Sequence, residues 1–192
     1  MINKMRVIGG SLKGRTLLAP AGSETRPTAE RTREALFQLL VSRYFPAGLE
    51  DVAVLDLYAG SGALGIEAIS RGAASVHAFE SGNAAVKAMR QNLKSLEIEH
   101  QVQLHTAPLP RALDSYKDQA DLVFCDPPYD LDAVAMLQST LPVRVRARAI
   151  LCYEHARTAQ PVLKKPWRLL ERRTWGLATV SIFRLETRPT PA

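Results

Sequence analysis

Short apolar runs alternate with amphipathic stretches through the central part of the chain. A run of about four to eight apolar residues is typical of a buried strand, whereas apolar residues at every third or fourth position indicate a helix. Because the two patterns alternate, the sequence predicts an α/β fold with a parallel, doubly wound sheet. The expected strands are 52–57, 76–80, 102–105, 122–125 and 149–154, and the expected helices are 63–71, 84–96 and 132–141.

The two ends of the chain depart from this alternation. Residues 5–18 predict a small hairpin around a glycine-rich turn, and a helix is expected to begin near Thr28. Two strand-like runs, 167–172 and 178–185, predict a second hairpin near the C-terminus. We expect a single domain over residues 1–192, made of a basic N-terminal arm (1–27), a core (28–186) and a flexible tail (187–192).

The composition is that of an ordinary globular protein, with 46% hydrophobic and 23% charged residues. The chain has no apolar run near 18 residues and no N-terminal hydrophobic segment, so we expect a cytoplasmic protein without a membrane span. Cys125 and Cys152 lie in apolar runs and are expected to be buried thiols. The four histidines show no metal-ligand spacing, and we expect no metal site.

Charge is segregated along the chain, although the net charge is only +6. Residues 1–33 carry seven Lys and Arg against two Asp and Glu, and residues 143–192 carry eleven against three. The centre, residues 34–142, carries seven against fourteen. Basic flanks around an acidic centre favour a polyanionic partner such as nucleic acid, although a solvated basic surface would give the same counts.

The apolar run 122–125 ends abruptly at Asp126. Pro127 and Pro128 then prevent both helix and further strand pairing, because proline has no backbone N–H. Asp126 and the turn carbonyls can only accept hydrogen bonds, and Tyr129 offers a flat face for a planar ring. An amine on a nucleobase would satisfy both, but the motif alone is equally consistent with a strand end that only packs.

A glycine-rich loop, Asp56-Leu-Tyr-Ala-Gly-Ser-Gly-Ala-Leu-Gly65, follows the first sheet strand and opens a helix. Glu80 ends the next strand, where a carboxylate can accept the hydroxyls of a ribose, so the pair indicates an adenosine-containing cofactor. The glycine spacing also fits dinucleotides, yet the carboxylate of Asp56 would repel a pyrophosphate and suits an ammonium group. These features favour S-adenosylmethionine over NAD.

Three segments, Asp56–Gly62, Phe79–Glu80 and Asp126–Tyr129, resemble the class I S-adenosylmethionine-dependent methyltransferases that act on exocyclic amines. Two more, Met5–Leu18 and Arg26–Phe37, are similar to bacterial methyltransferases that modify the N2 amine of a guanine in 16S ribosomal RNA. The resemblance implies a seven-stranded, Rossmann-like sheet in which the last hairpin supplies one antiparallel strand. An N6-adenine methyltransferase acting on DNA or RNA, or an enzyme acting on a protein amide, is the alternative. A non-catalytic nucleic-acid-binding module with the same fold is a third reading, which the filled catalytic positions disfavour.

The candidate site residues fall into three groups. The catalytic group is Asp126, Pro127 and Tyr129, and the cofactor-binding group is Asp56, Tyr58, Ala59, Gly60, Gly62, Glu80 and Asp126. The RNA-binding group is Lys4, Arg6, Lys13, Arg15, Arg26, Thr28, Arg31 and Arg33. The chain departs from the expected pattern at Thr106-Ala107-Pro108, where an acidic or polar residue was expected to meet the adenine amine. The implied partner of this monomer is 16S rRNA in an assembling 30S subunit.

Overall fold

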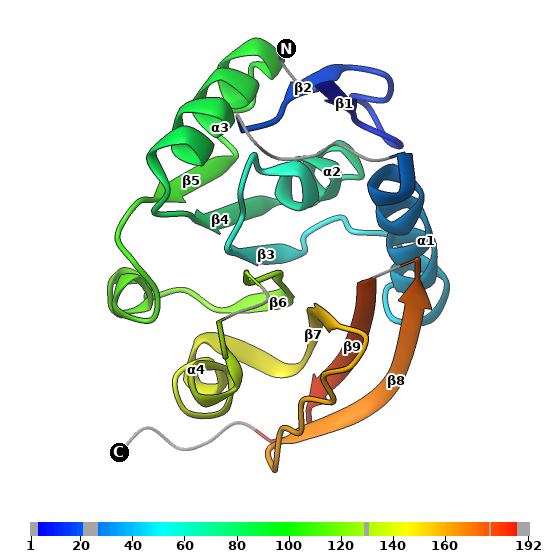
Figure 1. The fold of residues 1–192 in the computed structure, drawn as a ribbon, viewed down its shortest axis with the longest axis vertical. Helices are drawn as coiled ribbons and strands as arrows, with labels where there is room; N and C mark the ends of the chain where they lie inside the picture. The colour runs from blue at the N-terminus through cyan, green and yellow to red at the C-terminus, as the bar shows by residue number, and fades with distance from the viewer. Residues whose placement is uncertain (1–3, 21–26, 129–130, 177, 188–192) are drawn as a thin grey trace.

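The computed structural model describes residues 4–20, 27–128, 131–176 and 178–187, and Figure 1 shows their arrangement. In chain order the elements are β1 (Lys4–Arg6), β2 (Thr16–Leu18), α1 (Pro27–Arg43), β3 (Ala53–Leu57), α2 (Ala63–Ser70), β4 (Ser75–Phe79), α3 (Asn83–Leu96), β5 (Val102–His105), the 3-10 helix η1 (Arg111–Ser115), β6 (Ala120–Cys125), α4 (Val134–Ser139), the 3-10 helix η2 (Pro142–Arg144), β7 (Val145–Ala156), β8 (Trp167–Trp175) and β9 (Ala178–Leu185).

Seven strands form one sheet in the order β5-β4-β3-β6-β7-β9-β8. Strands β3 to β7 are parallel, and β9 runs antiparallel to both of its neighbours. The predicted seven-stranded sheet with one antiparallel strand is therefore confirmed. Strands β4 and β5 lie on one side of β3, whereas β6 and β7 lie on the other. The direction in which strands are added therefore reverses between β3 and β6, and a crevice is expected at the carboxyl ends of these two strands.

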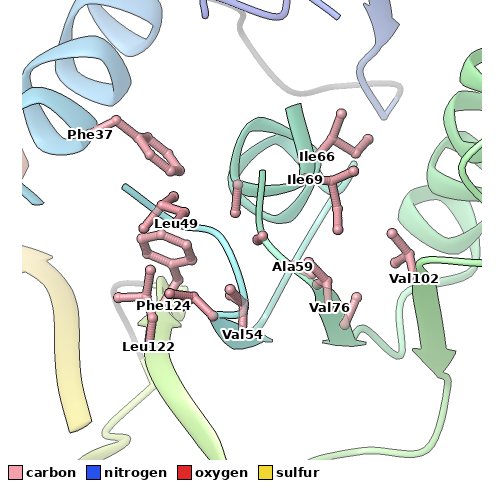
Figure 2. Packing of buried hydrophobic residues seen from close by; sticks show 14 of the residues in the cluster. Phe37, Leu49, Val54, Ala59, Ile66, Ile69, Val76, Val102, Leu122 and Phe124 are labelled. Carbon is pink, nitrogen blue, oxygen red and sulfur yellow. The ribbon is translucent and has the colours of Figure 1, made fainter. Parts of the chain in front are cut away.

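Helices cover both faces of the sheet, with α1, α2 and α3 packed on one face and α4 with η1 on the other. On the first face, Phe37 of α1 packs against Phe124 of β6 with ring centroids 5.5 Å apart (Figure 2). The predicted buried run of β6 is confirmed, because residues 122–125 are all buried. Cys125 and Cys152 are buried free thiols, as the sequence predicted. None of the helices in the described parts of the chain is long and apolar enough to cross a membrane.

Strand β7 is longer than the sequence predicted, because it begins at Val145 and not at residue 149. A bulge explains the difference, since Ala120 of β6 pairs with Val145 whereas Leu122 pairs with Ile150. The intervening Arg146, Ala147 and Arg148 are exposed, so this part of the strand lacks an apolar run. Helix α4 is correspondingly shorter than predicted.

The N-terminal hairpin of β1 and β2 is fastened to the helices beside it (Figure 1). The backbone amides of Ile8 and Gly9 both donate to the buried carboxylate of Glu67 in α2, each at 2.8 Å. Asn92 of α3 accepts from the Leu18 amide at 2.7 Å and donates to the Leu18 carbonyl at 3.0 Å. Polar side chains of α2 and α3 thus satisfy backbone groups of the hairpin that would otherwise be unpaired.

Two glycines in this hairpin allow a matched test of its packing. Gly10 (φ +77°) and Gly14 (φ +83°) share a left-handed backbone conformation, but a Cβ on Gly10 would lie 1.7 Å from the Ser70 carbonyl oxygen, whereas Gly14 faces no atom within 4 Å. Both alanine variants should lose about 1–2 kcal/mol through backbone strain. Gly10→Ala should lose clearly more free energy of unfolding in urea, and equal losses would show that the hairpin does not depend on this contact.

Candidate active site

Carboxylates gather where four neighbouring strands end. Asp56 lies near the end of β3, Glu80 and Asp126 follow β4 and β6, and Glu154 lies in β7. Cys125 pairs with Tyr153, so continuing the register by one residue sets Asp126 beside Glu154 on the adjacent strand. Because side chains alternate along a strand, Asp56, Asp126 and Glu154 are directed toward the face covered by α1 and α2.

A cleft of about 610 Å³ opens at this edge of the sheet. Its volume lies within the range of roughly 300–1,000 Å³ that is typical of small-molecule sites. It is lined by Tyr58, Glu80, Ser81, Gly82, Asp126, Pro127, Pro128, Leu131 and Glu154. A smaller hollow continues from it and is lined by Tyr58, Phe79, Glu80, Ser81, Ala107 and Leu109. Ala107 belongs to the segment 106–108, where an acidic or polar residue was expected, and it therefore lines a hollow next to the cleft.

Hydrogen bonds from backbone amides hold the glycine-rich loop against the acidic strand ends. The carboxylate of Glu80 accepts from the Gly60 amide at 2.9 Å and from the Gly82 amide at 2.6 Å. The buried carboxylate of Asp56 accepts from the Gly65 amide at 2.9 Å. Tyr58, although not a glycine, has a φ of 61°. This left-handed conformation turns the chain into the loop directly after β3.

The cleft fits an adenosine-containing cofactor such as S-adenosylmethionine. Each oxygen of Glu80 accepts one backbone hydrogen bond and keeps a further lone pair, which a ribose hydroxyl could use. The cleft lies at the switch point of the sheet, where nucleotides bind in open α/β folds. Among the described residues no group of three or more His, Cys, Asp or Glu could hold a metal ion.

The acidic side chains favour a cationic ligand and hold protons more tightly than usual. Burial raises the pKa of Asp56 to about 7, opposed by the Gly65 amide and reinforced by Asp126 and Glu80. Asp126 is exposed at the mouth of the cleft, but the surrounding walls reduce its hydration and raise its pKa. Desolvation and the charge of Asp126 together raise the pKa of Glu154.

The structure brings together part of the predicted site. Tyr58, Glu80, Asp126 and Pro127 line the cleft, whereas Ala59, Gly60 and Gly62 form the loop behind it. The expected contact between Asp56 and a cofactor ammonium is not supported, because Asp56 is 1% exposed, lies outside the cleft lining and accepts from Gly65. Tyr129 lies outside the described residues.

Glu154 was not among the predicted site residues, yet it lines the cleft. The available signal was a carboxylate directly after the apolar run 149–153, in the same position that Asp126 occupies after its own run. Only the register between β6 and β7 shows that the two carboxylates are neighbours.

The predicted RNA-binding cations occupy different places. Lys4, Arg6, Lys13, Arg15 and Arg31 are exposed, whereas Arg26 and the side chain of Thr28 lie outside what the structure describes. The Met5 sulfur lies 3.9 Å from the Ser61 hydroxyl of the glycine-rich loop, and because side chains alternate along a strand, Lys4 and Arg6 of β1 are directed away from this contact. At the other end, Arg15 donates to the Ser95 carbonyl of α3 at 2.8 Å.

Arg33 differs from the expectation of a solvent-facing cation. It is 6% exposed and lies 3.6 Å from the Glu67 carboxylate, and its guanidinium also donates to the Arg6 carbonyl. Arg33 therefore holds the hairpin against α2 and is not available to a phosphate.

The chain is similar to proteins of several bacteria. It is 34% identical to YlbH of Bacillus subtilis (strain 168) over 186 residues, which cover 94% of this chain and 98% of that protein. It is 36% identical over 126 residues to the ribosomal RNA small subunit methyltransferase D of Escherichia coli (strain K12), covering 66% and 61% of the two chains. The solved structure of the Escherichia coli protein yhhF matches with a TM-score of 0.82 at 28% identity and covers 96% of this chain and 99% of that one.

One protein family, described as conserved hypothetical protein 95, matches residues 5–184. The match includes the N-terminal hairpin, the glycine-rich loop, the Asp126 turn and most of the final hairpin. The fold is the class I methyltransferase fold that the motifs predicted. The chain therefore belongs to the conserved hypothetical protein 95 family, and the family resemblance inferred from its motifs is confirmed.

Proposed function

We propose that this chain transfers a methyl group from S-adenosylmethionine to the N2 amine of a guanine in small-subunit ribosomal RNA. The observation that carries the proposal is the position of Asp126 and Pro127 in one cleft with Glu80, whose carboxylate accepts from the Gly60 amide of the glycine-rich loop behind it. Relatives from Haemophilus influenzae and Escherichia coli that are named ribosomal RNA small subunit methyltransferase D support the substrate class. We expect a monomer that acts in the cytoplasm on an assembling 30S subunit.

The protein's task in this reaction is to orient a weak nucleophile. The lone pair of the guanine amine is delocalised into the ring, and the bound cofactor would supply an electrophilic methyl group on a sulfonium. Asp126 and the Pro127 carbonyl would accept hydrogen bonds from the two amine N–H groups, which fixes the nitrogen and localises its lone pair. After the methyl group has been transferred, Asp126 or water would take the proton that the methylated nitrogen loses. The Pro128 carbonyl already accepts from the Leu131 amide at 2.9 Å, and no bond to the Pro127 carbonyl is found within the described ranges.

The target base must leave its stack to reach the cleft. Unstacking costs a few kcal/mol, less in a loop than in a duplex. Phosphate contacts from the exposed cations of the N-terminal arm would offset part of this cost. Tyr129 follows Pro128 directly and remains our candidate for stacking on the flipped base.

Labelled S-adenosylmethionine tests the proposal when it is incubated with naked 16S rRNA, small subunits or DNA. We expect label in N2-methylguanosine from one of the two RNA-containing substrates. Label in N6-methyladenine would instead support the alternative substrate, and the absence of label in all three would overturn the proposed function. Comparing naked RNA with small subunits identifies the form of substrate that the enzyme accepts.

Charge reversal tests the role of the arm. Arg6→Glu with Arg31→Glu removes two exposed cations where β1 meets the first turns of α1, and Lys13→Glu with Arg15→Glu removes cations at the far end of the hairpin. Removing a cation that binds a phosphate should weaken RNA binding and reduce the salt dependence of log K by about 0.7 for single-stranded RNA. Lys117→Glu, exposed before β6 at the opposite edge of the sheet, is the matched control. Unchanged affinity across salt concentrations would contradict a binding role.

The rate of methyl transfer should increase with pH on the acidic side of its pH profile. Desolvation raises the pKa of Asp126, so the group stays protonated to a higher pH than an ordinary aspartate. The protonated acid loses acceptor capacity and negative charge, and the rate should therefore fall as the pH drops through this raised pKa. We expect a fall in kcat/KM that begins above the ordinary aspartate range, and a flat profile down to about pH 4 would contradict this role.

A further inference from the structure

Glu154 presents to the cleft a carboxylate that the proposed methyl transfer leaves without a role. It is half-buried in the wall of the cleft, and no hydrogen bond or ion pair to its carboxylate is found among the residues that the structure describes. By contrast, Glu80 accepts two backbone amides and Asp56 accepts one. An unpaired carboxylate in a partly desolvated wall is costly unless a ligand supplies hydrogen-bond donors.

The position of Glu154 assigns it to one side of the cleft. The neighbouring strands follow the order β4-β3-β6-β7. Glu80 and the glycine-rich loop, which follow β4 and β3, therefore lie on one side of β6, and Glu154 of β7 lies on the other. Asp126 stands between these two sides, next to Glu154 in the continued register of β6 and β7. A base whose amine reaches Asp126, with the cofactor against Glu80, therefore extends toward Glu154.

The edge of guanine suits two adjacent carboxylates. Beside its N2 amine, guanine presents a second donor, N1–H, whereas adenine presents an N1 lone pair beside its amine. An ionised carboxylate can only accept hydrogen bonds. We propose that Glu154 accepts the N1–H of the target guanine and thereby selects guanine against bases that lack this donor. This inference rests on the proposed function and names the residue that determines its base specificity.

The electrostatics of the cleft agree with this assignment. Desolvation, with the charge of Asp126 adding to it, raises the pKa of Glu154 to about 8, so the ionised carboxylate of Glu154 depends on a hydrogen-bond donor that stabilises it. Guanine would place one N–H donor against each carboxylate and so relieve their repulsion. A base with a lone pair at N1 supplies no donor to the ionised carboxylate of Glu154 and could pair only with its protonated form.

The test compares two bases at the target position of an RNA substrate. 2-Aminopurine keeps the same amine as guanine but carries a lone pair at N1 in place of N1–H and a hydrogen in place of the O6 carbonyl, so a Glu154 variant is needed to isolate the effect of N1. The wild-type enzyme should methylate guanine with a kcat/KM about 10²-fold higher, the loss expected when a hydrogen-bonding group of the site is left unpaired. Glu154→Gln should reduce this ratio at least tenfold, because the glutamine amide can donate to the N1 lone pair of 2-aminopurine.

Asp126→Asn supplies the contrast, because Asp126 meets the amine that both bases share. This variant should lower kcat/KM for the two substrates by similar factors and leave their ratio near the wild-type value. A Glu154→Gln enzyme that methylates RNA with the wild-type ratio would overturn the inference and leave the proposed function intact. Equal use of the two bases by the wild-type enzyme would overturn it without any variant, whereas a wild-type enzyme inactive on guanine would refute the proposed function itself.

Discussion

Asp126→Asn should lower methyl transfer by about 10²–10³-fold, the loss typical of removing one hydrogen-bonding group that stabilises a transition state. The side chain keeps its size, but one acceptor oxygen becomes an N–H₂ donor that faces the amine of the substrate. Binding of S-adenosylmethionine, measured by calorimetry, should change little because Glu80 and the glycine-rich loop remain in place. Single-turnover kinetics with labelled cofactor would measure the methyl-transfer step directly.

Asp51→Asn is a matched control for this variant. Asp51 is exposed in the turn before β3, at the opposite edge of the sheet, and its φ of 63° is a conformation that asparagine tolerates well. The control should keep wild-type turnover and stability. If Asp126→Asn also kept wild-type turnover, the amine would not be held at this carboxylate and the proposed chemistry would be wrong.

The sheet could be predicted because its strands carry local signals. The run 122–125 is apolar without interruption and ends at Asp126, so both its burial and its end were visible in the sequence. The glycine-rich loop and Glu80 were likewise visible as a spacing, and they are joined by a hydrogen bond of 2.9 Å. These features depend on neighbouring residues, or on a spacing that the fold repeats.

Contacts between distant segments were the part that could not be predicted. Arg33 lies among exposed charges in the sequence, and only the folded hairpin shows that it is buried against Glu67. Glu154 follows an ordinary strand-like run, and its place in the cleft depends on the register of β7 with β6. Asp56 was correctly placed at the loop, but its buried bond to Gly65 could not be distinguished from an open, ligand-facing position.

Glu67, the partner of Arg33, makes several buried contacts that the sequence does not reveal. It is 1% exposed, and one carboxylate accepts the amides of Ile8 and Gly9 and pairs with Arg71 at 2.8 Å and Arg33 at 3.6 Å. Burial lowers the pKa of Arg33 while the charge of Glu67 opposes that effect, so the guanidinium depends on this carboxylate to stay buried and charged.

Glu67→Ala should therefore destabilise the protein by about 3–5 kcal/mol, the usual loss when one partner of a buried ion pair is removed. For a chain of this length, that corresponds to a fall in melting temperature of roughly 6–20 °C. The variant leaves Arg33 buried without its counter-charge and the amides of Ile8 and Gly9 without an acceptor. Urea unfolding measures the loss, with Glu99→Gln, an exposed carboxylate, as the control.

The hairpin should respond more than the core. Because Glu67 holds the hairpin from the side of α2, its loss should let trypsin cleave after Lys13 and Arg15 before the sheet unfolds.

A double variant tests the ion pair itself. Adding Arg33→Met to Glu67→Ala removes the guanidinium that Glu67→Ala leaves without its ion-pair partner. The double variant should therefore lose less free energy of unfolding than the sum of the losses of the two single variants. Strict additivity, or a hairpin cleaved no faster than in the wild type, would show that Glu67 does not fasten the arm. A detached arm would also weaken RNA binding while leaving cofactor binding at Glu80 intact, which links the stability of this buried cluster to substrate capture.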